Sequence, residues 1–151
     1  MRGLIFDPFA GISGDMVLGA LVDVGLPVEW LEGFVASLGL EAVGVAVERV
    51  NRRGISCARV RFELPHEHAH RHLRHVLEIV DATAAPAAVR ALAAEAFRRL
   101  AAAEAEVHGT SIEKVHFHEV GALDAIVDVA GACLALELLG VDRVECSPLP
   151  L

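Results

Sequence analysis

The chain has 151 residues, of which 54% are hydrophobic and 23% charged, and its formal net charge is −8. A chain of this length forms one domain that buries roughly two-thirds of its unfolded surface, and its apolar content excludes disorder as the dominant state. Thirteen basic residues against 21 acidic ones disfavour a nucleic-acid-binding surface. No apolar run reaches the roughly 18 residues of a membrane span, and the spacing of the three cysteines suits neither a disulfide framework nor a zinc site. We therefore expect a reduced, soluble, cytoplasmic protein.

The first half of the chain predicts a strand, two helices and a hairpin. A short apolar run stopped by Pro8 suits a buried strand, and Gly25 and Gly39 end the two apolar segments that follow it. A turn at 51–54 separates two β-rich runs. The predicted elements are a strand at 2–7, helices at 16–24 and 28–38, and β-rich runs at 43–50 and 55–64.

The second half predicts three helices and two strands. Pro65 could start a helix, because apolar residues at 73, 76, 77 and 80 keep helical spacing. The predicted elements are helices at 65–80, 86–108 and 121–139, and strands at 115–119 and 143–146. Together these patterns predict an α+β fold in which a small mixed sheet packs against about five helices in one layered domain. The apolar helix at 121–139 should be the most buried of them.

A histidine-rich segment at 65–75 is the first candidate site. Five of the eight histidines lie in it, namely His66, His68, His70, His72 and His75. On a helix, His68, His72 and His75 share one face, whereas on an extended chain His66, His68 and His70 do. Either arrangement offers two or three nitrogen ligands to nickel, copper or zinc. We expect the segment to capture metal and to be poorly ordered without it, the alternative being a solvated polar helix start.

The second candidate site is a short strand with His116 and His118, followed by a helix with Asp124 and Asp128 one turn apart. The helix dipole accounts for an acid in the first turn, but a carboxylate one turn deeper needs a cation or backbone donors. Nitrogen and oxygen ligands from a strand and the next helix can form a metal site. A satisfied polar cluster is the alternative. If this is a site, Asp124 should lie within about 6 Å of one of the two histidines.

The third candidate site is the glycine-containing loop that opens the first helix, with Ser13, Gly14 and Asp15 at its end. The backbone donors and positive dipole end of such a helix attract phosphate. Asp7 and Asp15 would repel a bare anion, so a phosphorylated ligand would need a divalent cation to bridge it to them. A purely structural turn is the alternative.

Two long segments resemble signatures of the LarC family of nickel insertion proteins. Residues 6–21, FDPFAGISGDMVLGAL, resemble the opening signature of that family, and residues 116–129, HFHEVGALDAIVDV, are similar to its second signature. The histidine-rich segment and the Ser-Pro-Leu-Pro run at 147–150 also lie where the family has them. The resemblance therefore covers the whole chain, in the right order.

The resemblance implies a CTP-dependent nickel chelatase, an enzyme of the lyase type. Family members insert nickel into pyridinium-3,5-bisthiocarboxylic acid mononucleotide and so complete the nickel-pincer cofactor of lactate racemase. Residues 1–151 would be the single amino-terminal domain of a longer protein whose carboxyl-terminal part handles CTP with a divalent cation, which can leave this fragment inactive by itself. The implied partners are the cofactor precursor and lactate racemase or its maturation proteins, and a homo-oligomer stays open.

The chemistry of the residues suggests how the three candidate sites divide this work. The histidine-rich segment collects nickel, and transfer follows to a tighter site at His116, His118 and Asp124. The Ser13–Asp15 loop holds the phosphate of the nucleotide so that its sulfur atoms face the metal. The alternative function is a non-catalytic nickel chaperone or storage module.

Overall fold

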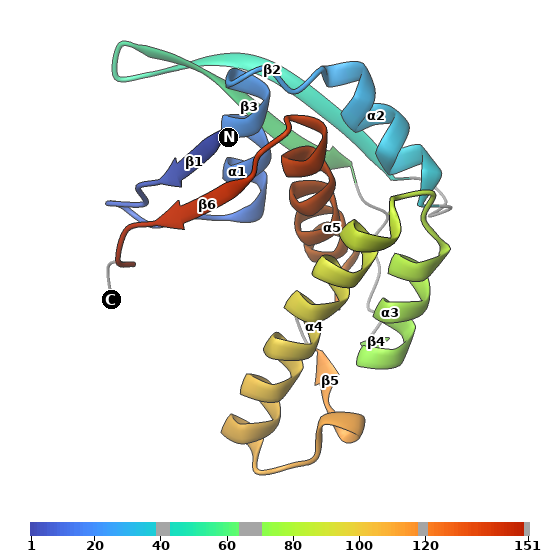
Figure 1. The fold of residues 1–151 in the computed structure, drawn as a ribbon. Coiled ribbons are helices and arrows are strands. Elements are labelled where there is room, and N and C mark those ends of the chain that lie inside the picture. The colour runs from blue at the N-terminus through green and yellow to red at the C-terminus, as the bar shows by residue number, and fades with distance from the viewer. Residues whose placement is uncertain (39–42, 64–70, 118–120, 150–151) are drawn as a thin grey trace.

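Five α-helices and six short strands make up the part of the chain that the computed structural model describes, residues 1–38, 43–63, 71–117 and 121–149 (Figure 1). In chain order the elements are β1 (Gly3–Phe6), α1 (Gly14–Asp23), α2 (Val28–Ser37), β2 (Gly44–Arg52), β3 (Ile55–Glu63), β4 (Arg71–His72), α3 (Leu73–Ala82), α4 (Ala87–His108), the 3-10 helix η1 (Ile112–Lys114), β5 (His116–Phe117), α5 (Leu123–Leu138) and β6 (Arg143–Cys146). The predicted α+β class and number of helices are confirmed. None of the described helices is long and apolar enough to cross a membrane.

The described strands form three two-stranded sheets, where the sequence predicted one mixed sheet. Strands β1 and β6 are parallel, with Gly3 opposite Arg143, whereas the β2–β3 hairpin and the short β4–β5 pair are antiparallel. The hairpin does not extend the β1–β6 pair, and helices pack against it, α1 on β3 and α2 on β2. Figure 1 shows the hairpin arching over the helices, with β1–β6 beside it and β4–β5 at the far end of α4.

Helix α5 lies in the middle of the molecule, as its apolar sequence predicted. Of its 16 residues only Asp124, Glu137 and Leu138 are exposed. Helices α1, α2, α3 and α4 all pack against it. Its glycine, Gly131, allows the Phe34 ring to approach, since a Cβ built there would lie 3.2 Å from Phe34 Cε1. The core therefore forms around α5 rather than on a sheet.

The turn residues act as the sequence predicted at three positions. In the hairpin turn Gly54 has a φ of +90°, and its N–H donates to Asn51 Oδ1 at 2.8 Å. Gly109 and Gly140 take left-handed conformations after α4 and α5, where an L side chain would be strained.

The predicted helix at 65–80 is confirmed from Leu73 onward and wrong at residues 71 and 72, while its first residues lie outside the described part of the chain. Arg71 and His72 form strand β4, and α3 begins only at Leu73. Cross-strand pairing with β5 holds His72 in an extended conformation, so His72 and His75 do not share a helix. The predicted strand at 115–119 is described only for His116–Phe117.

Gly19 tests how closely α1 packs on the hairpin. A Cβ at Gly19 would lie 2.7 Å from the carbonyl oxygen of Ala58 in β3, so Gly19→Ala should lower the free energy of unfolding by about 1–3 kcal/mol. Gly33 in α2 is exposed and its Cβ would meet nothing within 4 Å, so Gly33→Ala should raise it by about 0.5–1 kcal/mol. Urea unfolding measures both. Equal effects would contradict close α1–β3 packing.

Candidate functional site

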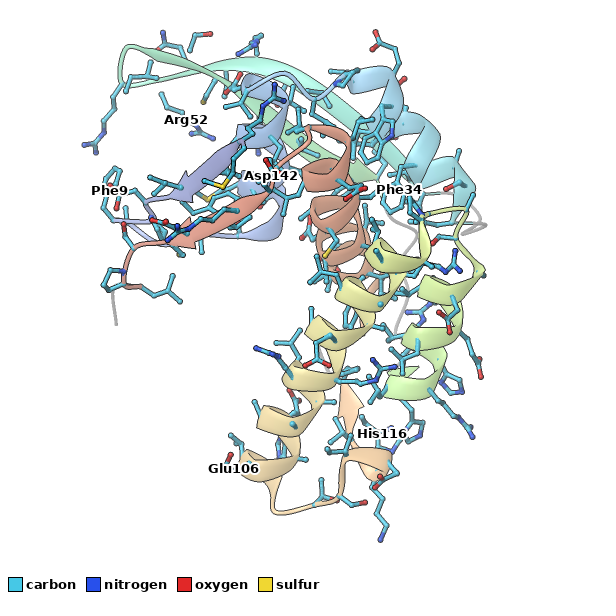
Figure 2. The ribbon with its side chains drawn as sticks, in the orientation of Figure 1. Phe9, Phe34, Arg52, Glu106, His116 and Asp142 are labelled. Atoms are coloured by element: carbon cyan, nitrogen blue, oxygen red, sulfur yellow. The ribbon has the colours of Figure 1, made fainter. Side chains whose placement is uncertain are left out.

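Three imidazoles come together at the β4–β5 pair. His72 and His116 face each other across the two strands, with ring centroids 3.9 Å apart. His75, in the first turn of α3, has its ring centroid 5.8 Å from that of His72. Figure 2 shows His116 at the end of the molecule where β5 and α3 meet. We call His72, His75 and His116 the imidazole cluster; it joins the histidine-rich segment to the second candidate site.

Hydrogen bonds orient two of these rings. His72 Nδ1 lies 3.1 Å from the carbonyl oxygen of Val115, which can only accept, so Nδ1 carries the proton. In the neutral ring this leaves the lone pair of Nε2 available, an arrangement common in metal-binding histidines. His75 Nε2 instead accepts a hydrogen bond from Arg74 Nε at 3.1 Å. His72 is therefore the better prepared ligand of the two.

Buried residues and hydrogen bonds next to the imidazole cluster hold its strands in place. Phe117, next to His116, is completely buried in the core. Arg71 Nη1 donates to the carbonyl oxygen of Gly121 at 2.9 Å and so ties β4 to the turn before α5. A Cβ on Gly121 would lie 2.8 Å from Phe117 Cβ, so only glycine lets the chain pass this closely. These contacts fix the positions of His72 and His116 relative to the start of α5.

An open hollow of about 420 Å³ adjoins His72, between α3 and η1. Its wall is mostly apolar, with one cationic and one anionic side chain at the rim; the lining residues are His72, Leu73, Arg74, Leu77, Ile112 and Glu113. Hydrogen bonds from its own backbone and from the Ser111 side chain lower the pKa of Glu113. A small ligand could therefore approach the imidazole cluster from this side.

A second group of functional side chains gathers where α1 meets α5. Asp128 packs directly against Gly14, where a Cβ would lie 2.2 Å from Asp128 Cγ. The Oδ1 atom of Asp128 is buried and has no hydrogen-bond partner among the described residues. Burial, followed by the negative charges of Asp15 and Asp124, raises the pKa of Asp128 to about 7. We call Asp15, Asp124 and Asp128 the acidic group; it brings the first signature segment against the second.

The carboxylate of Asp15 already accepts the hydrogen bonds that the loop at Ser13–Asp15 offers at the start of α1. Asp15 accepts hydrogen bonds from the Ser13 hydroxyl and, at 2.9 Å, from the N–H of Met16. With Asp128 beside Gly14, negative charge surrounds the helix terminus. A bare phosphate is therefore disfavoured, whereas a phosphate bridged by a cation suits these oxygens.

Several predicted site residues lie outside the described residues, namely His66, His68, His70 and His118. The expectation that the histidine-rich segment is poorly ordered without metal therefore stays a prediction, and so does the expected distance from Asp124 to one of the two histidines. Within the described ranges, no three His, Cys, Asp or Glu side chains are grouped so that they could hold a metal ion. The sequence left the role of Asp128 open. The signal that could have assigned it to a site was its position one turn inside an apolar helix.

Comparison with known proteins agrees with the two signature segments. The family model described as "Nickel insertion protein" matches residues 4–151. The chain belongs to the nickel insertion protein family. No solved structure matches it.

Curated relatives carry the same name. Nickel insertion proteins so named in Geotalea daltonii and Thermomicrobium roseum are 45% and 48% identical to the chain over all of its length. A relative in Desulfitobacterium hafniense, 43% identical over 99% of the chain, is named pyridinium-3,5-bisthiocarboxylic acid mononucleotide nickel insertion protein. The chain spans only 37–39% of the length of these three nickel insertion proteins.

The half-buried Asp128 should make stability depend on pH. Because its pKa is raised to about 7, the folded chain keeps a proton that the unfolded chain loses near pH 4. The free energy of unfolding should therefore fall as pH rises from 4 to 7 and level off above that. Asp128→Asn should remove this fall and be more stable than the parent at pH 8 by roughly 1–2 kcal/mol, after a discount for partial exposure.

Urea unfolding between pH 4 and pH 8 in metal-free buffer measures this difference. Asp81→Asn, which removes an exposed carboxyl group at the end of α3, is the matched control and should keep the parent profile. Parallel profiles for Asp128→Asn and its parent would show that Asp128 is ionised at low pH in the folded chain.

Proposed function

We propose that this chain is the nickel-handling portion of a CTP-dependent nickel chelatase. Its substrate would be the mononucleotide for which the Desulfitobacterium hafniense relative is named, and its product the nickel-pincer cofactor of lactate racemase. Membership of the nickel insertion family supports the metal, and the relative's name supports the acceptor. The three free cysteines and the sulfur groups of the acceptor both suit a reducing cytoplasm.

The observation that carries this proposal is the cross-strand pair of His72 and His116. His72 belongs to the histidine-rich segment at 65–75, and His116 opens the segment similar to the second signature. Their ring centroids are 3.9 Å apart, so nickel released by one ring is already within reach of the other. We therefore assign His72 two tasks: it is the last ligand of the capture segment and the first ligand of the transfer site.

Ligand exchange is the chemistry that this arrangement favours. Neutral imidazoles bind nickel but release it more readily than thiolates do. The thiocarboxylate sulfurs of the acceptor are softer ligands, so they can draw the ion from the imidazoles. Formation of a carbon–nickel bond displaces a proton from the ring carbon, and an imidazole that has just released nickel can accept that proton. The hollow beside His72 gives the acceptor room to approach.

The acidic group would serve the phosphate side of the reaction. We assign Ser13, Gly14 and Asp15 to a nucleotide phosphate held through a divalent cation, with oxygens of Asp15 and Asp128 as ligands of that cation. The buried, unpartnered Oδ1 of Asp128 fits such a cation, and the surrounding negative charge does not fit a bare triphosphate. When bound, CTP supplies phosphoryl chemistry, and we assign its handling to the part of the family protein that this chain does not span.

Nickel titration of the chain tests the assignment of the imidazole cluster. His72→Ala and His116→Ala should each weaken the tightest nickel site at least about tenfold, because each removes a nitrogen ligand from the same site. The double variant should be little weaker than either single variant, since they share that site. Isothermal titration calorimetry measures the affinities.

His108→Ala is the matched control, because His108 lies at the end of α4, where it contacts Glu104, outside the cluster. It should leave the tightest site unchanged. Effects of His72→Ala and His116→Ala that simply add would indicate two separate sites and contradict a shared one.

Insertion by a full-length family member carrying this chain separates transfer from capture. Replacing His116, His118 and Asp124 by alanine should abolish nickel insertion while bulk nickel binding persists. A variant without His66, His68, His70 and His75 should bind fewer nickel ions and should only insert nickel more slowly when nickel is limiting. Adding His72→Ala to that variant should stop nickel insertion. Full insertion by the triple variant would contradict the transfer site, and failure of any family member to nickelate the mononucleotide would favour the storage module.

A further inference from the structure

The β1–β6 sheet presents an uncovered apolar face far from the imidazole cluster. In Figure 2 the side chain of Phe9 projects outward beside β1, and 85% of its surface is exposed. Ile5 of β1 is 69% exposed. Further large apolar side chains around β1 and after β6 are exposed, and the set is Ile5, Phe9, Ile12, Met16 and Leu149. We call these five residues the β1–β6 face; Val144, opposite Leu4 in the register, lies on the other side of the sheet.

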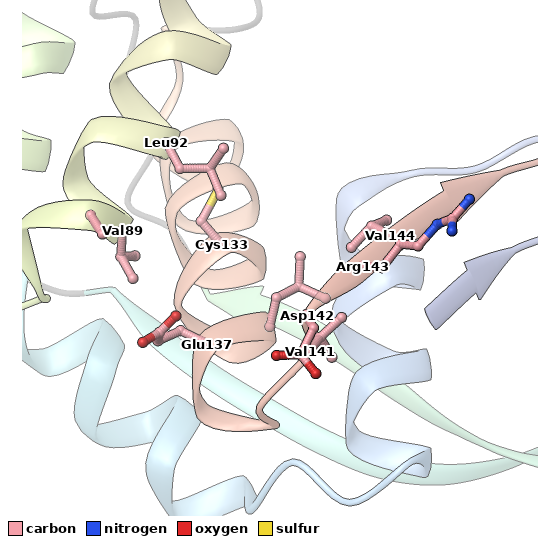
Figure 3. Close-up of a pocket in the computed structure, with 10 residues that line it drawn as sticks. Val89, Leu92, Cys133, Glu137, Val141, Asp142, Arg143 and Val144 are labelled. Atoms are coloured by element: carbon pink, nitrogen blue, oxygen red, sulfur yellow. The ribbon is translucent and has the colours of Figure 1, made fainter. Parts of the chain in front are cut away.

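A hollow lies on each side of this sheet. The first, about 300 Å³, is lined by residues 5–12 and by Met16, Val17 and Ala20 of α1. The second, about 270 Å³, lies between β6, α4 and α5 (Figure 3). In Figure 3, Val144 of β6 and Leu92 of α4 line this second hollow, and Leu92 is exposed as well. Apolar surface therefore continues from the sheet onto α4.

Such a sheet is not expected to stand by itself in water. Parallel strands in proteins are covered on both faces, and two-stranded sheets are marginally stable at best. Here one face is covered, since Leu4 packs against the small cluster of Leu21, Leu26 and Ala135. Neither β1 nor β6 has a second strand partner among the described residues. The Ile5 side of the sheet, where β6 carries the ion-paired Arg143 and Glu145, and both edges are thus open to a partner with β-structure.

The length of the relatives indicates what that partner is. More than three-fifths of each of the three relatives lies outside the part that this chain matches. A second copy of the chain is a poorer candidate, because each copy carries a net charge of −8 and like charges oppose association.

We infer that the β1–β6 face is the surface against which the remaining part of the nickel insertion protein packs, adding at least one strand to the β1–β6 sheet. Strand addition pairs the open backbone groups of an edge, and the apolar side chains of the β1–β6 face leave water at the same time. This interface is independent of nickel, since the imidazole cluster lies at the other end of α4.

Cys146 reports on this face without any engineered probe. It lies in β6 and is exposed, whereas Cys57 of β3 and Cys133 of α5 are half-buried. We would compare the 151-residue chain with a full-length hybrid in which it replaces the matched segment of the Thermomicrobium roseum relative. Thiol labelling, followed on the Cys146 peptide by mass spectrometry, should be at least about tenfold slower in the hybrid.

Two substitutions show whether the protection comes from this face. Phe9→Asp should restore fast labelling of Cys146 in the hybrid and leave its rate in the 151-residue chain unchanged. Val107→Asp is the matched control, because Val107 is an 82% exposed apolar residue at the other end of α4. It should leave Cys146 protected in the hybrid.

Three results would overturn the inference. The first is equal labelling of Cys146 in the chain and the hybrid. The second is a dimer of the 151-residue chain, seen by sedimentation, that Phe9→Asp dissociates, because the partner would then be a second copy. Fast labelling of all three cysteines would instead show that the hybrid is misfolded. In that case the inference is tested by hydrogen exchange of the native Thermomicrobium roseum protein. The segment aligned with Gly3–Phe6 should exchange slowly there, and fast exchange is the third contrary result.

Discussion

The close approach of α1 to α5 is the constraint on which the rest of the molecule depends. Gly14 leaves the space that Asp128 fills, and one turn further along each helix Gly131 lies against Leu18, where a Cβ would be 3.5 Å from Leu18 Cδ2. On its other side α1 packs on β3 through Gly19. Because small residues stand at each crossing, one helix can bind both the hairpin and the central helix. The two signature segments meet at this contact.

A carboxylate at this contact has an energetic cost. The buried Oδ1 of Asp128 has no described hydrogen-bond partner, and two further carboxylates stand nearby. An apolar residue at 128 would remove that cost, so the fold alone does not require an aspartate there. A cation held by the acidic group would offset the burial and the repulsion together. The fold by itself therefore does not explain Asp128, and the cation-binding role proposed above would.

The imidazole cluster and the acidic group lie at the two ends of one connection. Arg71 ties β4 to Gly121, which stands just before α5, and the first turns of α5 carry Asp124 and Asp128. Nitrogen ligands at one end have the chemistry that late transition metals prefer, whereas oxygen ligands at the other end have the chemistry that hard cations prefer. The division of work proposed above, with nickel at one end and nucleotide phosphate at the other, follows this difference in ligand type.

Much of this could be read from local sequence, because local patterns reflect local physics. Apolar periodicity located all five helices approximately, and glycines marked the hairpin turn and the ends of α4 and α5. The resemblance of residues 6–21 and 116–129 to a known family placed the chain in the nickel insertion proteins, as the family match over residues 4–151 confirms.

Only the tertiary structure decided which distant residues meet. Spacing placed His72 on a helix with His75, but pairing with β5, 44 residues away in sequence, holds it in a strand opposite His116. Helices packed against β2–β3 divided the predicted single sheet into three pairs. The space over Gly14 is visible only once α1 lies on α5, and Asp128, whose Oδ1 is buried with no hydrogen-bond partner among the described residues, fills it. Sequence by itself determined most of the elements and the family, whereas the contacts that bring distant residues together depend on long-range packing, which no local pattern encodes.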